Sequence, residues 1–470
     1  MPLGLSSCVG PDDLVEADQP SHTSSWIKPS DPQEKIGSRE HPLVVAKYGG
    51  EYKNDKVEAL LAVIVGRLIA VSEDKSRVYK VTVLNSPKVN AFALPGGFLY
   101  VTRGLVALAN DTSELAAVLS HEMAHVSANH AILRNKQQAQ GKVGKQVVNE
   151  VLGNTLASKV ALAANKLRFS DFSKDQELQA DAIGIRMLGN AGYDAHGAAR
   201  FLQTMQAYQS LSKKSKDRFG DASFLSSHPT TPQRIELAKR HARFFGAPGL
   251  GEADRARYQK GIDGILFGDS SDEGFVRENS FSHAGLGITF SVPKGAKIEN
   301  QSTSVIINGP DTLATRFDAA ILGRFQSLGE YMKSGWVNGL DESSIQETVY
   351  NGLPVASAKA KGGDWDFVVQ AILLDRQVYR FITAGPIGNR QILEASTKIA
   401  KSFRRLSEAE QAKLRPLKIK IVNVGAQDTL GSFAAKMKGT EQGLKMFQIL
   451  NGLSAGQVPA IGSRVKIISD

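Results

Sequence analysis

Hydrophobic and polar positions follow two different patterns along most of the chain. From residue 41 to 248 the apolar positions recur mainly at helical spacing, with a short β section between the helices. From residue 276 to 408 they alternate as in strands, with two helical stretches among them. A Gly/Asp-rich segment, 249–275, separates the two regions. The pattern predicts a mainly α domain with a small β-sheet, a linker and an α+β domain.

The β section of the first domain predicts three short strands. They are Tyr79–Leu84, Asn90–Leu94 and Phe98–Thr102, the last following a tight turn at Pro95-Gly96-Gly97. We expect these strands to form the edge of a small sheet.

A helix carrying candidate chemistry is predicted directly after the third strand. Asp111 lies three residues before Glu114, the spacing of a capping box, and the helix that begins there contains the sequence HEMAH. His121 and His125 are four residues apart, so both imidazoles project from one helix face and can bind one tetrahedral Zn²⁺. Glu122 lies beside them, where its carboxylate can take a proton from a metal-bound water.

A catalytic zinc with two His ligands needs a third protein ligand, and a second predicted helix offers one. Ser173 and Gln176 have capping-box spacing and begin this helix. Glu177 can complete a His₂Glu site, and Asp181, one turn later, can hydrogen-bond the outer nitrogen of a ligand His. Taken alone, Glu177 would be an ordinary solvated carboxylate. Together with HEMAH it predicts one zinc ion per chain.

Two further His residues, His130 and His228, have a different relation to this motif. His130 lies about 140° around the helix from His125, so we expect it to be a surface or core residue and not a metal ligand. His228 precedes Pro232, which begins an amphipathic helix reaching Phe245. His228 and Arg234 can stabilise the oxyanion of a tetrahedral intermediate, although a helix-capping loop would explain the same spacing.

Another role for His228 follows from the open position of a catalytic zinc. Because His228 lies on a predicted loop, it can bind the metal in a resting state and swing away when substrate arrives. The competing metal chemistry is a 2-His-1-carboxylate iron oxygenase, but such a site has no use for a base at Glu122.

Four motifs in a fixed order resemble one known family. HEMAH, ELQAD at 177–181, NAFALPGG at 90–97 and HPTTPQR at 228–234 are similar to motifs of the HtpX-like, CAAX-prenyl-protease-type zinc metallopeptidases. The resemblance is to the soluble bacterial envelope branch and runs from Tyr48 to the helix of Arg234.

The resemblance implies a role for each matching residue. The implied zinc ligands are His121, His125 and Glu177. The implied catalytic base and acid is Glu122. The implied role of Asp181 is to orient a ligand residue without binding the metal itself. The implied residues near the active site are His228 and Arg234. The implied strand edge, on which an extended substrate would pair, consists of Asn90, Ala91, Phe92 and Ala93.

Pairing along a strand edge gives little side-chain selectivity, which suits unfolded polypeptides. The sequence therefore predicts a zinc metalloendopeptidase that cleaves unfolded or misassembled envelope proteins. The competing hypothesis is a non-proteolytic or latent scaffold, chaperone-like, that binds peptidoglycan and partner proteins.

Two weaker resemblances concern the remainder of the chain. Residues 276–408 faintly resemble PsbP-like domains, without a diagnostic motif, and we expect a binding or scaffolding role there. Residues 416–470 resemble a LysM domain, the βααβ module that grips glycans such as peptidoglycan. Ala426-Gln427 interrupts the usual Gly-Asp-Thr-Leu of that module, and the segment between its helices is enlarged.

The composition and the charge of the chain exclude several classes of protein. The 470 residues allow about three domains. The single Cys, Cys8, excludes a disulfide within the chain and a multi-cysteine zinc site. The longest apolar stretch, Ala59 to Val71, contains Arg67 and is shorter than the ~20 residues of a membrane span. The net charge is +10, but aromatic residues do not alternate with the basic residues and no nucleic-acid-binding motif is present in the sequence. We therefore expect no nucleic-acid partner.

The N-terminus carries a candidate lipidation site. Leu5-Ser6-Ser7-Cys8 resembles a lipobox, but the segment before it is too short for a signal peptide. Either the start site lies upstream or the match is accidental. Residues 1–40 then predict a flexible tether. The expected location is the bacterial envelope, in the periplasm, with association to a membrane through a lipid anchor or peripherally, as for an outer-membrane lipoprotein.

Overall fold

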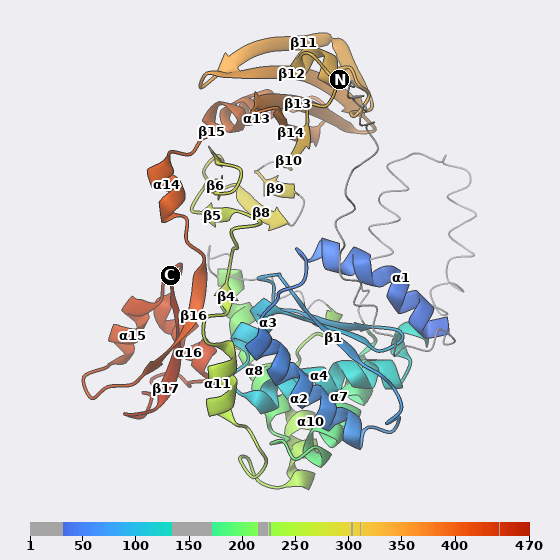
Figure 1. Ribbon diagram of the computed structural model, residues 1–470, viewed down its shortest axis with the longest axis vertical. Coiled ribbons are helices and arrows are strands. Elements are labelled where there is room, and N and C mark those ends of the chain that lie inside the picture. Colours follow the sequence, from blue (N-terminus) through green and yellow to red (C-terminus); the bar gives the residue numbers. More distant parts are fainter. Residues whose placement is uncertain are drawn as a thin grey trace, which may run out of the picture.

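The computed structural model describes residues 32–133, 172–214, 224, 227–301, 304–310, 312–440 and 442–470. In Figure 1 the helical body, which includes a small sheet, lies in the lower part of the molecule, the β-rich body lies above it, and the C-terminal module lies beside it. Cys8 lies outside the described residues. None of the described helices is both long and apolar enough to cross a membrane.

The helical body contains most of the first predicted domain. Its helices are α1 (Pro32–Lys47), α2 (Asp55–Val71), α3 (Arg103–Leu108), α4 (Thr112–Ser127), α7 (Lys174–Asn190), α8 (Gly197–Lys214), α10 (Pro232–Ala242), followed by the 3₁₀ turn η1 (Arg243–Phe245), and α11 (Arg255–Ile262). Its sheet contains β1 (Lys80–Leu84), β2 (Ala91–Leu94) and β3 (Phe98–Thr102) in the order β1-β3-β2. The three predicted strands are confirmed, as are the helices predicted to begin after Asp111, after Ser173 and at Pro232.

Helix α4 is the centre of this body. Every residue from Thr112 to Val126 is buried. The helix packs against α7 and α8, and β2 lies over it. A helix buried on all sides is fixed in place by its neighbours, so side chains on α4 can be held in precise positions.

The β-rich body contains two sheets. The seven-stranded sheet has the order β11-β12-β13-β14-β10-β9-β8, and the four-stranded sheet has the order β15-β7-β6-β5. Their strands are β5 (Phe275–Arg277), β6 (Ser280–His283), β7 (Ile288–Ser291), β8 (Lys297–Gln301), β9 (Ser304–Asn308), β10 (Ala314–Ile321), β11 (Leu340–Tyr350), β12 (Leu353–Gly362), β13 (Trp365–Leu374), β14 (Gln377–Pro386) and β15 (Arg404–Arg405). The helices are α12 (Leu328–Met332), α13 (Gln391–Ser402) and α14 (Glu408–Lys413).

The α+β prediction for this region is confirmed, because α13 packs against β13 and β14 while α12 packs against β11 and β12. The two sheets share a core rich in aromatic rings, among them Phe281, Phe290, Phe317, Phe381 and Phe403. The sequence predicts strands at 288–292, 315–321, 356–360, 366–373 and 378–384, which correspond to β7, β10, β12, β13 and β14; β5, β6, β8, β9, β11 and β15 were not expected.

The C-terminal module has the βααβ order: β16 (Leu417–Asn423), α15 (Leu430–Lys436), α16 (Gly443–Asn451) and β17 (Arg464–Ser469). Strand β16 pairs antiparallel with β17 on one side and with β4 (Leu266–Phe267) on the other. Its apolar residues belong to the same buried cluster as those of α2, α4 and α11. The module is therefore continuous with the helical body, and its likeness to a LysM domain stays a prediction.

A buried lysine joins the module to the helical body. Lys466 on β17 is 1% exposed. Its Nζ donates to the carbonyl oxygens of Ala107, Leu108 and Ala109 at 3.0, 3.1 and 2.7 Å. The last carbonyls of a helix lack partners within it. Lys466 thus caps the C-terminal end of α3, immediately before α4.

Two domain boundaries expected from the sequence are corrected. Residues 32–40, expected to be tether, belong to α1, where Gly37 packs directly on Pro95 and the ring of Phe98. Residues 249–275, expected to be a linker, contain α11 and β4. Tyr258 of α11 is completely buried, and its hydroxyl donates to the carbonyl of Val106. In both places tertiary packing orders a segment whose composition resembles a loop.

Candidate metal centre

The HEMAH residues lie on α4 in a fixed orientation. Asp111 caps the helix by accepting a hydrogen bond from the Glu114 backbone N–H at 2.9 Å. His121, Glu122 and His125 are all buried, at 6%, 1% and 4% exposure. The motif predicted from the sequence is therefore displayed toward the interior of the protein.

Helix α7 brings the acidic residues against α4. Its N-terminus has the predicted capping box, in which Ser173 and Gln176 each bind the other's backbone N–H. Close contact with α4 requires a small residue: a Cβ added to Gly184 would lie 3.1 Å from the backbone of His121. Glu177 and Asp181 are consequently buried beside the two His residues.

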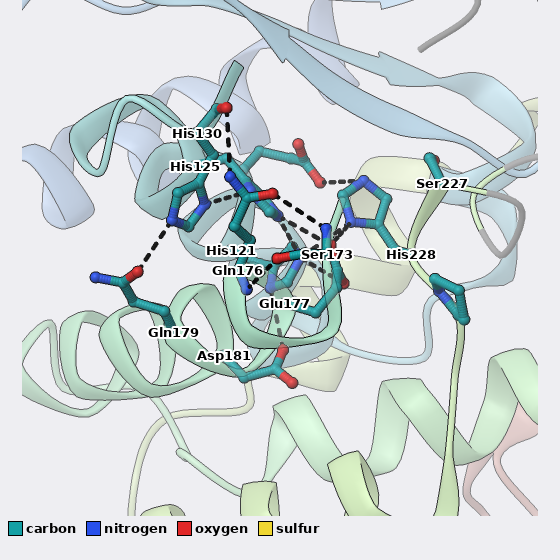
Figure 2. Close-up of polar contacts among 12 residues, drawn as sticks. His121, His125, His130, Ser173, Gln176, Glu177, Gln179, Asp181, Ser227 and His228 are labelled. Carbon is teal, nitrogen blue, oxygen red and sulfur yellow. Dashed lines mark hydrogen bonds and ion pairs between the residues drawn. The ribbon is translucent and has the colours of Figure 1, made fainter. Parts of the chain in front are cut away.

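Four side chains converge at one point, as Figure 2 shows. His121 Nε2 lies 3.0 Å from His125 Nε2 and 3.2 Å from His228 Nδ1. The Glu177 carboxylate lies 3.4 Å from His125 Nε2 and 2.9 Å from His228 Nδ1. Ligand atoms of these four residues all lie within 4.8 Å of one another. The structure thus brings His228 into the group predicted from HEMAH and Glu177.

This group fits a zinc ion. Imidazole nitrogens and a carboxylate are usual Zn²⁺ ligands, and a catalytic site uses three of them and leaves one position open. His121 Nε2 lies within 3.2 Å of a ring nitrogen of both His125 and His228. A ring nitrogen has either one proton or one lone pair, so it cannot form both of these contacts as ordinary hydrogen bonds, whereas all three nitrogens can bind one metal ion. Among the described residues, Glu122 Oε1 is buried without a hydrogen-bond partner, as expected if it faces the ligand of a metal.

The charges around the group also favour a cation. Burial by itself would raise the pKa of Glu177, but hydrogen bonds from His121, His125 and His228 hold this pKa far below its usual range. Burial raises the pKa of Glu122, and the charge of Glu177 adds to this rise. Burial lowers the pKa of His121, but the hydrogen bonds that it donates to Asp181 and Glu177 outweigh burial and raise this pKa to about 10. The acidic residues therefore attract positive charge to this point.

Each ligand His has a partner on its outer nitrogen. His121 Nδ1 lies 3.1 Å from Asp181 Oδ1, as predicted for Asp181. His125 Nδ1 lies 2.8 Å from His130 Nδ1, and His130 Nε2 lies 3.1 Å from Gln179 Oε1. His130 is buried and outside the ligand group, in agreement with the sequence analysis. Its contact with His125 and the role of Gln179 were missed, because the prediction placed His130 on the same helix as His125. The structure corrects this: α4 ends at Ser127 and the chain passes through Asn129 at a positive φ of 54° before it reaches His130.

Arg234 has a different place from the one expected. Its Nε and Nη2 donate to the two oxygens of Asp181, both at 2.7 Å. Its Nη1 donates to the carbonyl of Pro229 at 3.0 Å and lies 2.7 Å from Glu177 Oε2. A guanidinium occupied by two buried carboxylates is not free to bind an oxyanion. The structure therefore corrects the oxyanion role expected for Arg234 and makes it a positioning residue.

The predicted substrate edge is at the border of its sheet. Strand β2 pairs only with β3 among the described strands. The Asn90 carbonyl accepts a hydrogen bond from the Thr102 backbone N–H, so the backbone of Asn90 faces β3. Successive residues of a strand face opposite sides, and Ala91 and Ala93 therefore turn their backbone N–H and C=O groups away from β3. The Phe224 backbone N–H binds the Val89 carbonyl at the start of this edge.

Comparison with known proteins concerns the helical body. The profile of Peptidase family M48 matches residues 52–242. The matched region contains all four residues of the ligand group.

Two curated relatives share this M48 region. A mitochondrial metalloendopeptidase OMA1 from Arabidopsis thaliana is 33% identical over 159 residues, 34% of this chain and 30% of the relative. A putative beta-barrel assembly-enhancing protease from Vibrio cholerae is 28% identical over 191 residues, 38% of each chain. The chain thus spans about a third of the length of these relatives.

Among solved structures, cyanobacterial PsbP from Synechocystis matches 29% of this chain and 98% of its own, with 13% identity and a TM-score of 0.22. A likeness of this size carries no argument about fold or function.

The outer partner of His121 gives a first testable expectation. Asp181→Asn keeps the shape of the side chain but removes the charge that orients His121 and balances Arg234. We expect zinc affinity to fall about 10- to 100-fold. Competition with a chromogenic chelator measures it, and Asp175→Asn, on the same helix but exposed, is the matched control. Unchanged affinity would show that Asp181 serves Arg234 alone.

Proposed function

We propose that this protein is a zinc metalloendopeptidase that hydrolyses unfolded or misassembled proteins of the bacterial envelope. The observation that carries the proposal is the convergence of His121, His125 and Glu177 beside the buried carboxylate of Glu122. The proposed metal ligands are these three residues. Bound zinc supplies a water of lowered pKa and polarises the scissile carbonyl.

In this proposal Glu122 moves the proton. Its carboxylate is buried next to the ligand group, and burial raises its pKa, which favours accepting a proton from water and returning it to the leaving amine. Asp181 and His130 hold the two ligand imidazoles in one tautomer through their outer nitrogens. Arg234 fixes Asp181 and Glu177 together.

Substrate binding is assigned to the edge of β2 that lies opposite β3 and that no described strand pairs with. Of the four residues Asn90 to Ala93 predicted for this edge, Ala91 and Ala93 have backbone groups that face away from β3 and would pair with an extended polypeptide, whereas the backbone of Asn90 is bonded to Thr102. Because β2 packs on α4, a strand added there would pass near the ligand group. Backbone pairing favours unfolded chains over folded ones, which is why misassembled proteins are the proposed substrates.

The proposed location rests on the names of curated relatives and on the N-terminal motif. One relative is named a putative beta-barrel assembly-enhancing protease, and a role in envelope quality control is proposed for this chain by analogy. Periplasmic location, lipidation of Cys8 and peptidoglycan binding by residues 416–470 belong to the same proposal.

The direct test is hydrolysis of casein by the purified protein. We expect cleavage with zinc bound, loss of cleavage on treatment with a chelator, and recovery when zinc is restored. A protein that binds zinc stoichiometrically but cleaves no unfolded substrate would contradict the proposal and favour the latent scaffold.

His228 is proposed to gate the site. Its Nδ1 lies 3.2 Å from His121 Nε2 and 2.9 Å from Glu177 Oε1, the place of a fourth ligand, while its Nε2 lies 3.5 Å from Glu122 Oε1. In that position it blocks both the base and the open coordination position. Substrate would have to displace the His228 side chain from the ligand group before water is activated.

The gate makes His228→Ala a decisive variant. We expect casein hydrolysis to rise severalfold, because the fourth ligand position is opened permanently. Initial rates at equal zinc occupancy measure the effect, and His241→Ala, on α10 away from the ligand group, is the control. A fall in activity would instead assign His228 to the oxyanion.

A further inference from the structure

The connection between α10 and α11 presents an apolar loop to solvent. Residues 244–250, with the sequence FFGAPGL, carry no polar side chain. Phe244 is 83% exposed, more than any other large hydrophobic side chain in the described part of the chain, and Leu250 is 73% exposed. In Figure 1 this connection lies at the lower end of the molecule, away from the seven-stranded sheet. The loop, here called the 244–250 loop, is thus an apolar tip.

The 244–250 loop is held in a defined shape. The ring of Phe245 packs on Gly189 at the end of α7, where an added Cβ would lie 2.4 Å from the ring. His196 Nε2 lies 3.1 Å from the Gly246 carbonyl, and the Gly249 backbone N–H donates to Asp194 at 3.2 Å. Because its base is fixed, the loop exposes Phe244 and Leu250 as a constant feature of the surface.

Cations border this tip. Arg240 and Arg243, in the last turn of α10 and in η1, are exposed. Among the described residues neither has an ion-pair partner within 4.0 Å. Lys239 lies beside them and pairs with Glu236 at 2.7 Å. The loop itself contains no acidic residue to offset these charges.

We propose that the 244–250 loop, with Arg240 and Arg243, docks the protein on an anionic phospholipid bilayer. Aromatic and leucine side chains at a protruding tip enter the headgroup boundary of a bilayer, while arginines beside them bind lipid phosphates. The cations around the tip complement anionic headgroups. This inference rests on surface residues alone and is independent of catalytic activity.

The test is cosedimentation of the full-length, zinc-loaded chain with vesicles. Every protein carries Cys8→Ser, so that no lipid attached there contributes. We expect binding to vesicles of phosphatidylglycerol and phosphatidylethanolamine and little binding to phosphatidylcholine. Phe244→Ser with Leu250→Ser is expected to weaken binding at least ~10-fold. Arg240→Gln and Arg243→Gln are each expected to weaken it about fivefold, on anionic vesicles only.

A matched control uses exposed apolar residues elsewhere. Ile321 and Ile387, in the β-rich body, are 73% and 64% exposed, so Ile321→Ser with Ile387→Ser removes comparable apolar surface from another site. This variant is expected to bind vesicles like the parent. Thermal unfolding of each variant shows that the fold is kept.

A local probe reports insertion directly. Phe244→Trp is expected to shift its emission to the blue on anionic vesicles and to be quenched by brominated lipid, whereas Ile321→Trp is expected to do neither. Vesicle binding that the Phe244 and Leu250 changes leave intact would overturn the proposal. A second result would also overturn the proposal. If the Phe244 and Leu250 changes abolish self-association, measured by sedimentation without lipid, and leave vesicle binding unchanged, then the loop binds a second copy of the chain.

Discussion

Glu122→Gln is expected to lower casein hydrolysis by about 10²–10⁴-fold while zinc stays bound. The amide has the shape of the carboxylate but cannot accept the proton of the attacking water or return it to the leaving amine. Burial raises the pKa of Glu122, which favours acceptance of a proton from water. Initial rates of casein cleavage and zinc content per chain measure the two halves of this expectation.

The controls separate loss of the base from loss of the site. Glu236→Gln changes an exposed carboxylate and is expected to leave the rate unchanged. Retained hydrolysis in Glu122→Gln would show that another group takes the proton. Loss of zinc in the same variant would place Glu122 among the ligands and would leave the third ligand, Glu177, to be reassigned.

Removal of residues 417–470 is expected to unfold the helical body. The apolar residues of β16, α16 and β17 share one buried cluster with α2, α4 and α11, so the deletion would expose that core to water. We expect the truncated chain to lose cooperative thermal unfolding and to become sensitive to protease at low concentration. A truncated chain that stays folded and binds zinc would show instead that the module is dispensable.

A single substitution examines the same interface. Lys466→Met keeps the length of the side chain but leaves the carbonyls of Ala107, Leu108 and Ala109 without their donor. Each unsatisfied carbonyl costs ~1–3 kcal/mol, and part of this cost is offset because no ammonium has to be buried. We expect the free energy of unfolding in urea to fall by about 2–4 kcal/mol. Lys420→Met, exposed on β16, is the matched control, with an expected change within about 0.5 kcal/mol.

Local sequence signals predicted the elements that carry the chemistry. The capping residues Asp111 and Ser173 marked the starts of α4 and α7, because a cap acts on backbone groups two or three residues away. The tight turn at Gly96-Gly97 separated β2 from β3 in the same way. Strand β11 gave no such signal, since its side chains are largely exposed and its place depends on backbone pairing with β12.

The candidate site was predicted in its ligands and less completely in their surroundings. His121, Glu122 and His125 follow from spacing on one helix, and Glu177 from the need for a third ligand. The contacts of Arg234 with Asp181, and of His130 with His125 and Gln179, depend on how α4, α7 and α10 pack. Spacing along the chain carries no information about such packing.

The sequence by itself determined the helices α4, α7 and α10, the strands of the small sheet and the candidate metal-binding residues, because these depend on interactions within a few residues. Only the tertiary structure decided that His228 reaches the ligand group, that α11 belongs to the helical core, and that Lys466 fastens the C-terminal module beside α4. Those contacts join residues more than 100 positions apart for His228 and His121, and more than 350 for Lys466 and Ala109. Burial of a shared core brings them together, and no local pattern specifies that.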